Sequence, residues 1–224
     1  MPKRIIDLSV PLQAGDHGAG ARQLVASFPG LRLEGLPGQE GWAVELVRMS
    51  THSGTHMGAP YHYRSRSDEG QPMATIDQIP LGWCLGPGVK LDLRHLPDGH
   101  VVSPEELDAE LARIGHRLSP GDIVLINTAA GARYGCDDYL ERGCGVGRAG
   151  TVHLTGQGVR LVGTDAWSCD APFSFTQQRF ARAGDPSLIW EGHFAGSTIP
   201  YCQIEKLANL ERLPARGFTG SACR

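Results

Sequence analysis

The sequence has 224 residues, of which 41% are hydrophobic, and its formal net charge is -3 at pH 7. This length and composition suit an ordinary packed core, so we expect residues 1–224 to form a single domain. The small acidic charge, without runs of Lys or Arg, excludes the electrostatic footprint of a protein that binds nucleic acid or anionic membranes. We therefore expect a small-molecule substrate.

No targeting or membrane-spanning segment is visible in the sequence. There is no apolar stretch of about 18 residues, and the N-terminal residues lack the apolar region and cleavage site of a signal peptide. The six cysteines include no Cys-x-x-Cys pair, which argues against a zinc ribbon or a disulfide scaffold. We expect a cytoplasmic protein whose cysteines are reduced and mostly buried.

The first quarter of the chain predicts two strands around a long loop. Ile5–Val10 has strand composition, and the segment 13–41 is rich in Gly, Ala and Pro. Val44–Met49 alternates apolar with polar residues and leads directly into a histidine-rich segment. We therefore expect that segment on a loop at a strand end, where functional residues are commonly held.

The middle of the chain alternates predicted strands with a predicted helix. Val89–Leu93 is an alternating strand, whereas Ile123–Ile126 and Val159–Val162 are continuous apolar runs typical of strands buried on both faces. Ser103 begins a helix with Pro104 in the first helical position, and a capping box is expected. This alternation predicts an α/β domain with a mixed, partly buried sheet.

One glycine pattern is misleading. Residues 145–150 match the Gly-x-Gly-x-x-Gly pattern of dinucleotide-binding proteins, but they follow a helical-looking segment, 138–142, instead of a strand. The pattern lacks the strand-to-helix context on which its chemistry depends. We expect a flexible loop there.

The most informative segment runs from His52 to His62 and reads His-Ser-Gly-Thr-His-Met-Gly-Ala-Pro-Tyr-His. It holds three of the nine histidines of the chain. Imidazole is a common metal ligand and a common proton carrier near neutral pH, so the segment suggests a metal site, an acid/base site, or both.

The spacing of His52 and His56 does not suit a regular element. The intervening Ser-Gly-Thr is poor helix material, and an extended strand would separate the two by roughly 13 Å. A turn at Gly54 could direct both imidazoles to one ion. His62 could reach the same pocket as a third ligand or as an acid/base group.

Two histidines rarely hold a catalytic metal alone, so other ligands must come from distant sequence. Glu191 lies in an apolar stretch, where a carboxylate needs a cation or hydrogen-bond donors; an exposed Glu on an amphipathic element is the other interpretation. His193 and Asp165 are secondary candidates. Asp165 follows a buried strand and could orient the metal ligands or cap a loop.

At these residues the chain resembles the cyclase superfamily of metal-dependent hydrolases, which includes bacterial kynurenine formamidase and isatin hydrolase. The family motif reads His-x-Gly-Thr-His-x-Asp-x-Pro-x-His, and the chain matches it at His52, Gly54, Thr55, His56, Pro60 and His62. Further likenesses are Ile6–Ser9, Gly163–Asp165 and Trp190–Gly192, so the resemblance spans nearly the whole chain.

The resemblance implies a swivelling β/β/α fold, usually dimeric, that uses Zn²⁺ or Mn²⁺ to hydrolyse an amide, cyclic amide or lactone. By matching position, His52, His56 and Glu191 are implied as metal ligands and His62 as the acid/base. We expect a homodimer or higher homo-oligomer.

The chain departs from the family pattern at two positions. Gly58 stands where the family has an aspartate ligand, and Arg179 where formamidases have a histidine twelve residues before the glutamate. These differences favour one ion per site. Formamidases carry a substrate-contacting tryptophan in the early loop, whereas residues 11–41 contain no Trp, only Phe28. This difference argues against kynurenine formamidase itself and leaves Phe28 as a candidate substrate contact. The chain also ends at Arg224, before a terminal strand that we expect in similar members.

The leading hypothesis is a hydrolase in which one divalent ion activates water and His62 transfers its proton. Trp167 and neighbouring aromatic residues could line a pocket for an aromatic or cyclic substrate, although such residues also pack cores. Arg179 could hold a substrate carboxylate. The alternatives are a cyclase or isomerase without hydrolysis on the same fold, and a metal-poor binding protein.

Overall fold

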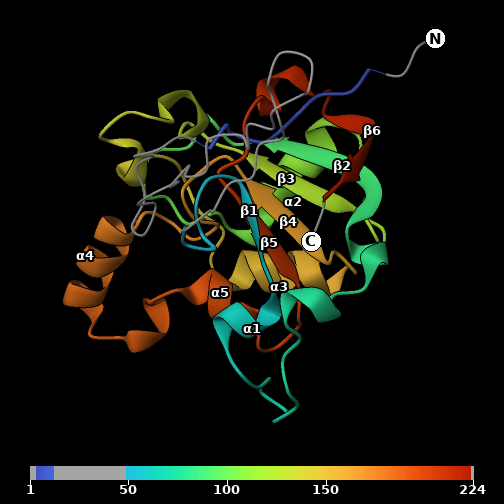
Figure 1. The fold of residues 1–224 in the computed structure, drawn as a ribbon. Helices are drawn as coiled ribbons and strands as arrows, with labels where there is room; N and C mark the ends of the chain where they lie inside the picture. The colour runs from blue at the N-terminus through green and yellow to red at the C-terminus, as the bar shows by residue number, and fades with distance from the viewer. Residues whose placement is uncertain (1–3, 13–48, 223–224) are drawn as a thin grey trace, which may run out of the picture. The chain divides into compact units, whose positions relative to one another are not determined.

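The computed structural model describes residues 4–12 and 49–222 (Figure 1). The chain divides into two compact units, residues 11–54 and the remainder, Met1–Val10 with Thr55–Arg224. The second of these holds all the helices and strands described below. The expectation of one domain over residues 1–224 stays a prediction.

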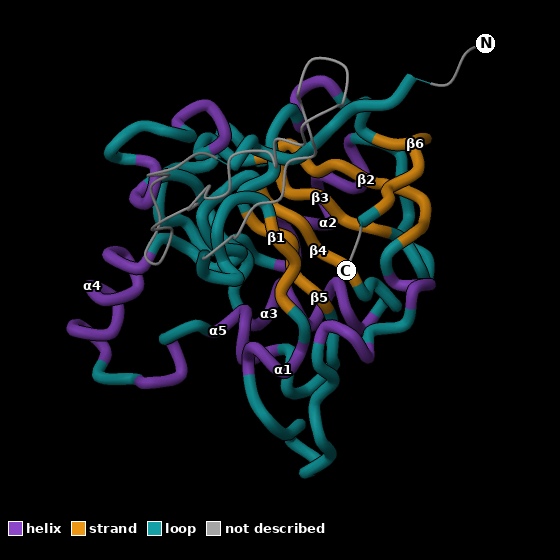
Figure 2. The backbone as a smooth tube through the Cα atoms, in the orientation of Figure 1, coloured by secondary structure: helices purple, strands orange, loops and turns teal. Residues whose placement is uncertain are grey.

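A six-stranded mixed sheet forms the centre of the larger unit (Figures 1 and 2). Its strands are β1 (His56–Gly58), β2 (Leu85–Asp92), β3 (Ile123–Asn127), β4 (Leu161–Thr164), β5 (Cys202–Glu205) and β6 (Arg216–Ser221), in the order β1-β5-β4-β3-β2-β6. Strands β2 to β5 are mutually parallel, whereas β1 and β6 are antiparallel at the two edges. The predicted α/β class with a mixed sheet is confirmed.

Five helices accompany the sheet: α1 (Pro60–Tyr63), α2 (Pro104–Arg113), α3 (Arg148–Gly156), α4 (Phe173–Ala183) and α5 (Glu191–Ala195). Helix α2 begins as its sequence predicts, since Ser103 accepts a hydrogen bond from Glu106 N–H and the Glu106 side chain accepts one from Ser103 N–H. This reciprocal pair satisfies two of the backbone donors that a helix start leaves open.

Side chains of successive strand residues alternate between two hydrophobic clusters. On β3, Val124 and Ile126 pack with Leu107 of α2 and Leu154 of α3, so these two helices cover that face. Ile123 and Leu125 belong to the cluster on the opposite face. The sheet is therefore covered on both faces around β3, which explains the continuous apolar sequence of that strand.

Some expectations about local structure require correction. Ile5–Val10 forms no strand: Leu8 C=O accepts a bond from Ala208 N–H, and Val10 N–H donates to Thr55 Oγ1. Residues 145–150 are only partly a loop, because α3 begins at Arg148. The loop expected at 13–41 and most of the strand expected at 44–49 lie outside the described residues.

Four of the five cysteines among the described residues are buried, as expected: Cys84, Cys144, Cys169 and Cys202. The fifth, Cys136, is partly exposed. Within residues 4–12 and 49–222, no helix has both the length and the apolar character needed to cross a membrane.

Candidate metal centre

The pairing of β1 with β5 places His56 directly opposite Glu205. The two side chains point to the same face of the sheet, and His56 Nε2 lies 3.3 Å from Glu205 Oε2. Both are largely buried. A histidine from the sequence motif and a carboxylate from the far end of the chain thus meet through strand register alone.

Glu205 is held as a carboxylate. Burial alone would raise its pKa, but a hydrogen bond with His56 and the positive charges of His193 and Lys206 lower the pKa to about 2. Glu205 Oε1 also accepts a hydrogen bond from Cys169 N–H at 3.3 Å. An ionised, buried carboxylate among nitrogen donors is a suitable ligand for a cation.

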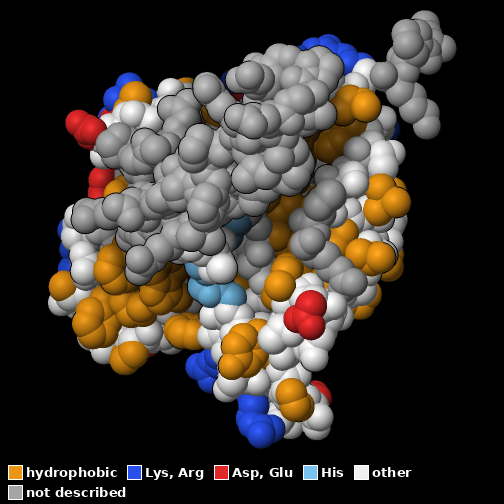
Figure 3. All heavy atoms as spheres, viewed as in Figure 1, with side chains coloured by type: hydrophobic (Ala, Val, Ile, Leu, Met, Phe, Trp, Pro, Cys, Tyr) orange, Lys and Arg blue, Asp and Glu red, His pale blue; other side chains and the backbone are white. Residues whose placement is uncertain are grey.

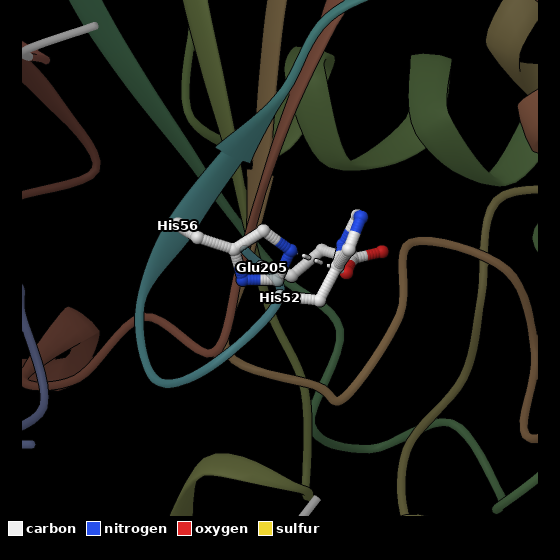
Figure 4. Close-up of side chains that lie close together, drawn as sticks. All are labelled: His52, His56 and Glu205. Atoms are coloured by element: carbon white, nitrogen blue, oxygen red, sulfur yellow. Dashed lines mark ion pairs between the residues drawn. The ribbon is translucent and has the colours of Figure 1, made fainter. Parts of the chain in front are cut away.

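Among the described residues, His52, His56 and Glu205 form a group that could hold a metal ion (Figure 4). Each offers one ligand atom, and these atoms lie within 4.8 Å of one another. Two ligands of a single zinc ion stand about 3 to 3.5 Å apart, which follows from metal–ligand bonds of about 2 Å. The separation of His56 and Glu205 already satisfies this, so the donor set fits one divalent ion.

His193 lies beside this group, on the short helix α5. Its Nδ1 forms a hydrogen bond with Asp170 Oδ2, and its Nε2 is 3.8 Å from Glu205 Oε1. Burial lowers the pKa of His193, but the bond and charge of Asp170 outweigh it, with help from Glu205, and the net pKa is raised. Asp170 also accepts hydrogen bonds from the backbone N–H groups of Gly192 and His193, so it fixes both the helix start and the imidazole.

His62, the third histidine of the motif, is exposed and lies on α1. Its ring centroid is 5.5 Å from that of His193 in an edge-on arrangement, and 5.7 Å from that of Tyr63. His62 is therefore close to His193 while remaining open to solvent. This combination suits a group that exchanges protons with a bound molecule.

Glu191 is not a member of this group among the described residues and has partners of its own. Arg179 Nη1 donates to Glu191 Oε1 at 2.6 Å, and Arg148 N–H donates to Glu191 Oε2 at 3.3 Å. Glu191 thus receives its guanidinium partner from α4, outside its own apolar stretch. Metal ligation by Glu191 stays a prediction, and Glu205 is the carboxylate that the structure brings to the histidines.

In formamidases a histidine stands twelve residues before the glutamate ligand, and a second pair of residues in this chain has that spacing. His193 lies twelve residues before Glu205, and these two side chains are neighbours. Arg179 and Glu191 have the same spacing, but they form an ion pair with each other. Glu205 also lies in a largely apolar strand, β5, so this local signal does not separate it from Glu191.

Asp165 lies outside the metal group. Thr128 donates to its carboxylate from both N–H, at 2.9 Å, and Oγ1, at 2.8 Å. Burial raises the pKa of Asp165 to about 7, although the bonds from Thr128 oppose this rise. Within the described structure, Asp165 thus ties the end of β4 to the end of β3.

Aromatic side chains extend from His193. Trp190 packs edge-on against the His193 ring with centroids 5.3 Å apart, stacks on Phe173 and lies 6.3 Å from Trp167. Lys206 Nζ is 5.4 Å from the centroid of Trp167. Figure 3 shows hydrophobic side chains gathered over α4, where Phe173 and Phe180 are partly exposed. Phe28 lies outside the described residues.

Comparison with known proteins identifies the family of this chain. Residues 6–171 match the sequence profile of the family described as "Putative cyclase". The chain belongs to this cyclase family. The match covers His52, His56 and His62 but ends before His193 and Glu205, which the structure brings to the same place.

Individual relatives agree with the family. Kynurenine formamidase of Salinibacter ruber is 34% identical over 125 residues, 55% of this chain and 51% of that protein. The chain thus matches about half the length of this curated relative. Isatin hydrolase A from Labrenzia aggregata is 26% identical and has a TM-score of 0.73, with 96% of this chain and 85% of that chain covered. Isatin hydrolase A from Ralstonia solanacearum shares the fold at 21% identity, TM-score 0.72 and coverage of 96% and 83%.

Proposed function

We propose that this member of the cyclase family is a metal-dependent hydrolase. It hydrolyses the carbon–nitrogen bond of an amide or cyclic amide, or the ester bond of a lactone, in a small molecule. The observation that carries the proposal is the convergence of His52, His56 and Glu205 on one position. The names of the relatives, a formamidase and isatin hydrolases, support the reaction class.

The donor set supports one divalent ion, Zn²⁺ or Mn²⁺, held by two imidazole nitrogens and a carboxylate oxygen. When bound, such an ion polarises a carbonyl group and makes water acidic enough to attack at neutral pH. The low pKa of Glu205 keeps its carboxylate ionised at any working pH. Asp170 directs His193 Nε2 toward Glu205 and thereby helps to orient that carboxylate.

His62 is the proposed acid/base. It accepts a proton from the attacking water and returns that proton to the leaving nitrogen or oxygen, so the products are a carboxylic acid and an amine or alcohol. Its exposure and its position beside His193 support this assignment. Trp167, with Trp190 and Phe173, offers flat apolar surface for an aromatic or cyclic substrate.

Arg179 is proposed to bind a substrate carboxylate. Because its guanidinium already pairs with Glu191, that carboxylate would have to compete with Glu191 for it. The predicted homodimer or higher homo-oligomer also stays a prediction, which sedimentation of the purified protein tests.

The decisive experiment compares two carboxylates. Purified protein is stripped with a chelator and reloaded with Zn²⁺ or Mn²⁺, and the bound metal is measured by mass spectrometry. The reloaded protein is then tested on formanilides, cyclic amides and lactones in ¹⁸O-labelled water. We expect one ion per chain and ¹⁸O in the acid product. Glu205→Gln should lose the metal, whereas the matched variant Glu191→Gln should retain it.

Two results would contradict the proposal. The first is wild-type protein that binds neither ion, or binds one without hydrolysing any substrate class. The second is a cyclised or isomerised product that contains no ¹⁸O. Retention of metal by Glu205→Gln together with its loss in Glu191→Gln would restore Glu191 as the ligand.

A further inference from the structure

Gln203 carries a buried polar atom that the proposed site does not use. Its side chain is 1% exposed. The Nε2 amide donates to Tyr201 OH, which in turn donates to Gly192 C=O at 3.0 Å. Among the described residues, however, the amide oxygen Oε1 has no hydrogen-bond partner. An unsatisfied buried acceptor costs about 1 to 3 kcal/mol, so this oxygen calls for a donor.

Strand register places Gln203 within the site. Gly58 of β1 is its cross-strand partner, just as His56 is the partner of Glu205. Residues two apart on a strand share a face, so Gln203 and Gly58 lie on the same face as Glu205 and His56. The opposite face belongs to Cys202 and Ile204, which pack in the second hydrophobic cluster.

Gly58 leaves room at this point. A methyl group built on Gly58 would meet one atom of the described structure within 4 Å, His62 Cδ2 at 3.6 Å. Gly58 is absent from the glycines with positive φ, so its backbone does not require glycine. Among the described residues, the missing side chain thus leaves space beside His62, on the face of the sheet that Gln203 shares, without a conformational reason for it.

We propose that Gln203 is a positioning residue whose amide oxygen holds a water molecule in the space beside Gly58 and presents it to His62. This inference rests on the proposed function, because this water is the hydrolytic one. One O–H of the water donates to Gln203 Oε1 and the other to His62, while an oxygen lone pair faces the substrate carbonyl. On attack, the water oxygen forms a C–O bond to the carbonyl carbon, and His62 takes one proton while the other stays on the new acid group. The bond from the carbonyl carbon to the leaving nitrogen or oxygen then breaks, and His62 delivers its proton to that atom.

Two variants test the water through different atoms. Gly58→Ala fills the space without a steric clash, and replacing glycine at an unstrained position changes the stability of the fold little or raises it by up to about 1 kcal/mol. Gln203→Leu removes the acceptor with little change in volume. Both should lower kcat about 10- to 100-fold, as misplacing a reacting group does, with KM within about twofold and metal content unchanged.

Asn127→Leu is the matched control. Asn127 is also buried and its Nδ2 has no partner within the described residues, but alternation along β3 directs it to the opposite face of the sheet. If Gln203 acted only by filling the core, Asn127→Leu and Gln203→Leu would affect melting temperature and kcat in parallel. We expect Asn127→Leu to keep the wild-type kcat.

High-resolution crystal structures of the metal-free protein supply a readout independent of activity. Density for a water within about 3 Å of Gln203 Oε1 is expected in the wild type and not in Gly58→Ala. A dry space in the wild type, or wild-type kcat in both variants, would overturn the inference and leave the hydrolase assignment intact. Wild-type protein that binds metal but hydrolyses nothing would instead refute the proposed function and, with it, the role of the water.

Discussion

Asp165→Asn tests how burial controls the pH dependence of stability. Asp165 has a folded-state pKa of about 7, against 3.8 for an ordinary aspartate, because burial raises it. Between these two values the folded protein holds a proton that the unfolded chain has lost. The free energy of unfolding therefore falls as pH rises through this window, and the full penalty is present above pH 7.

The magnitude follows from the difference between the two pKa values. Each pH unit corresponds to about 1.4 kcal/mol, so the protein loses about 4 kcal/mol between pH 4 and pH 8 through this one group. Asp165→Asn removes the ionisation but keeps an oxygen that accepts the N–H and O–H of Thr128. Its unfolding free energy should therefore fall less than that of the wild type over the same range and exceed it above pH 7.

The assay is urea unfolding at half-unit steps from pH 4 to pH 8.5, with chelator present so that metal binding does not contribute. Asp137→Asn, which removes an exposed carboxylate of the described surface, is the control and should follow the wild type. Equal pH slopes for the wild type and Asp165→Asn would refute the reasoning, because the burial of Asp165 would then have no effect on its protonation.

Three further predictions concern the framework of the site. Gly145→Ala should prevent folding, because its Cβ would lie 1.9 Å from Ala171 N. Gly156→Ala in α3 meets nothing within 4 Å of the described structure and should add up to about 1 kcal/mol to the free energy of unfolding. Urea titration followed by circular dichroism distinguishes the two variants, and equal behaviour would contradict the packing described. Asp170→Ala removes the acceptor of two backbone N–H groups and of the His193 imidazole, so we expect a loss of about 3 to 5 kcal/mol by the same titration; an unchanged midpoint would show that α5 does not need this carboxylate. Ser103→Ala should cost about 1 kcal/mol through loss of the α2 cap, and a change below about 0.3 kcal/mol would argue that water replaces the hydroxyl.

The sequence was most informative where local pattern and local structure coincide. The cap at Ser103 and the buried strand at Ile123–Ile126 depend on neighbouring residues, and both are confirmed. Ile5–Val10 shows the opposite case. Its composition favours a strand, but strand formation depends on a partner, and this segment instead makes isolated bonds to Ala208 and Thr55.

The same distinction separates the two carboxylates. His52 and His56 could be recognised because they lie in one short motif. Choosing between Glu191 and Glu205 required knowledge of long-range contacts: Arg179 comes from α4 to bind Glu191, and the β1–β5 register brings Glu205 to His56. Neither contact leaves a local signal in the sequence, so an apolar neighbourhood alone could not show which carboxylate lies beside the histidines.

The pairing of His56 with Glu205 also has a consequence for biosynthesis. One ligand lies on a three-residue edge strand from the first third of the chain and the other on the last parallel strand. The ion-binding group can therefore assemble only after the ribosome has released β5 and the edge strand has docked on it in register. A slip of one residue would turn His56 to the far side of the sheet. Uptake of the proposed ion would then report correct pairing of β1 with β5, because a chain that lacks β5 or pairs it out of register lacks the complete donor set.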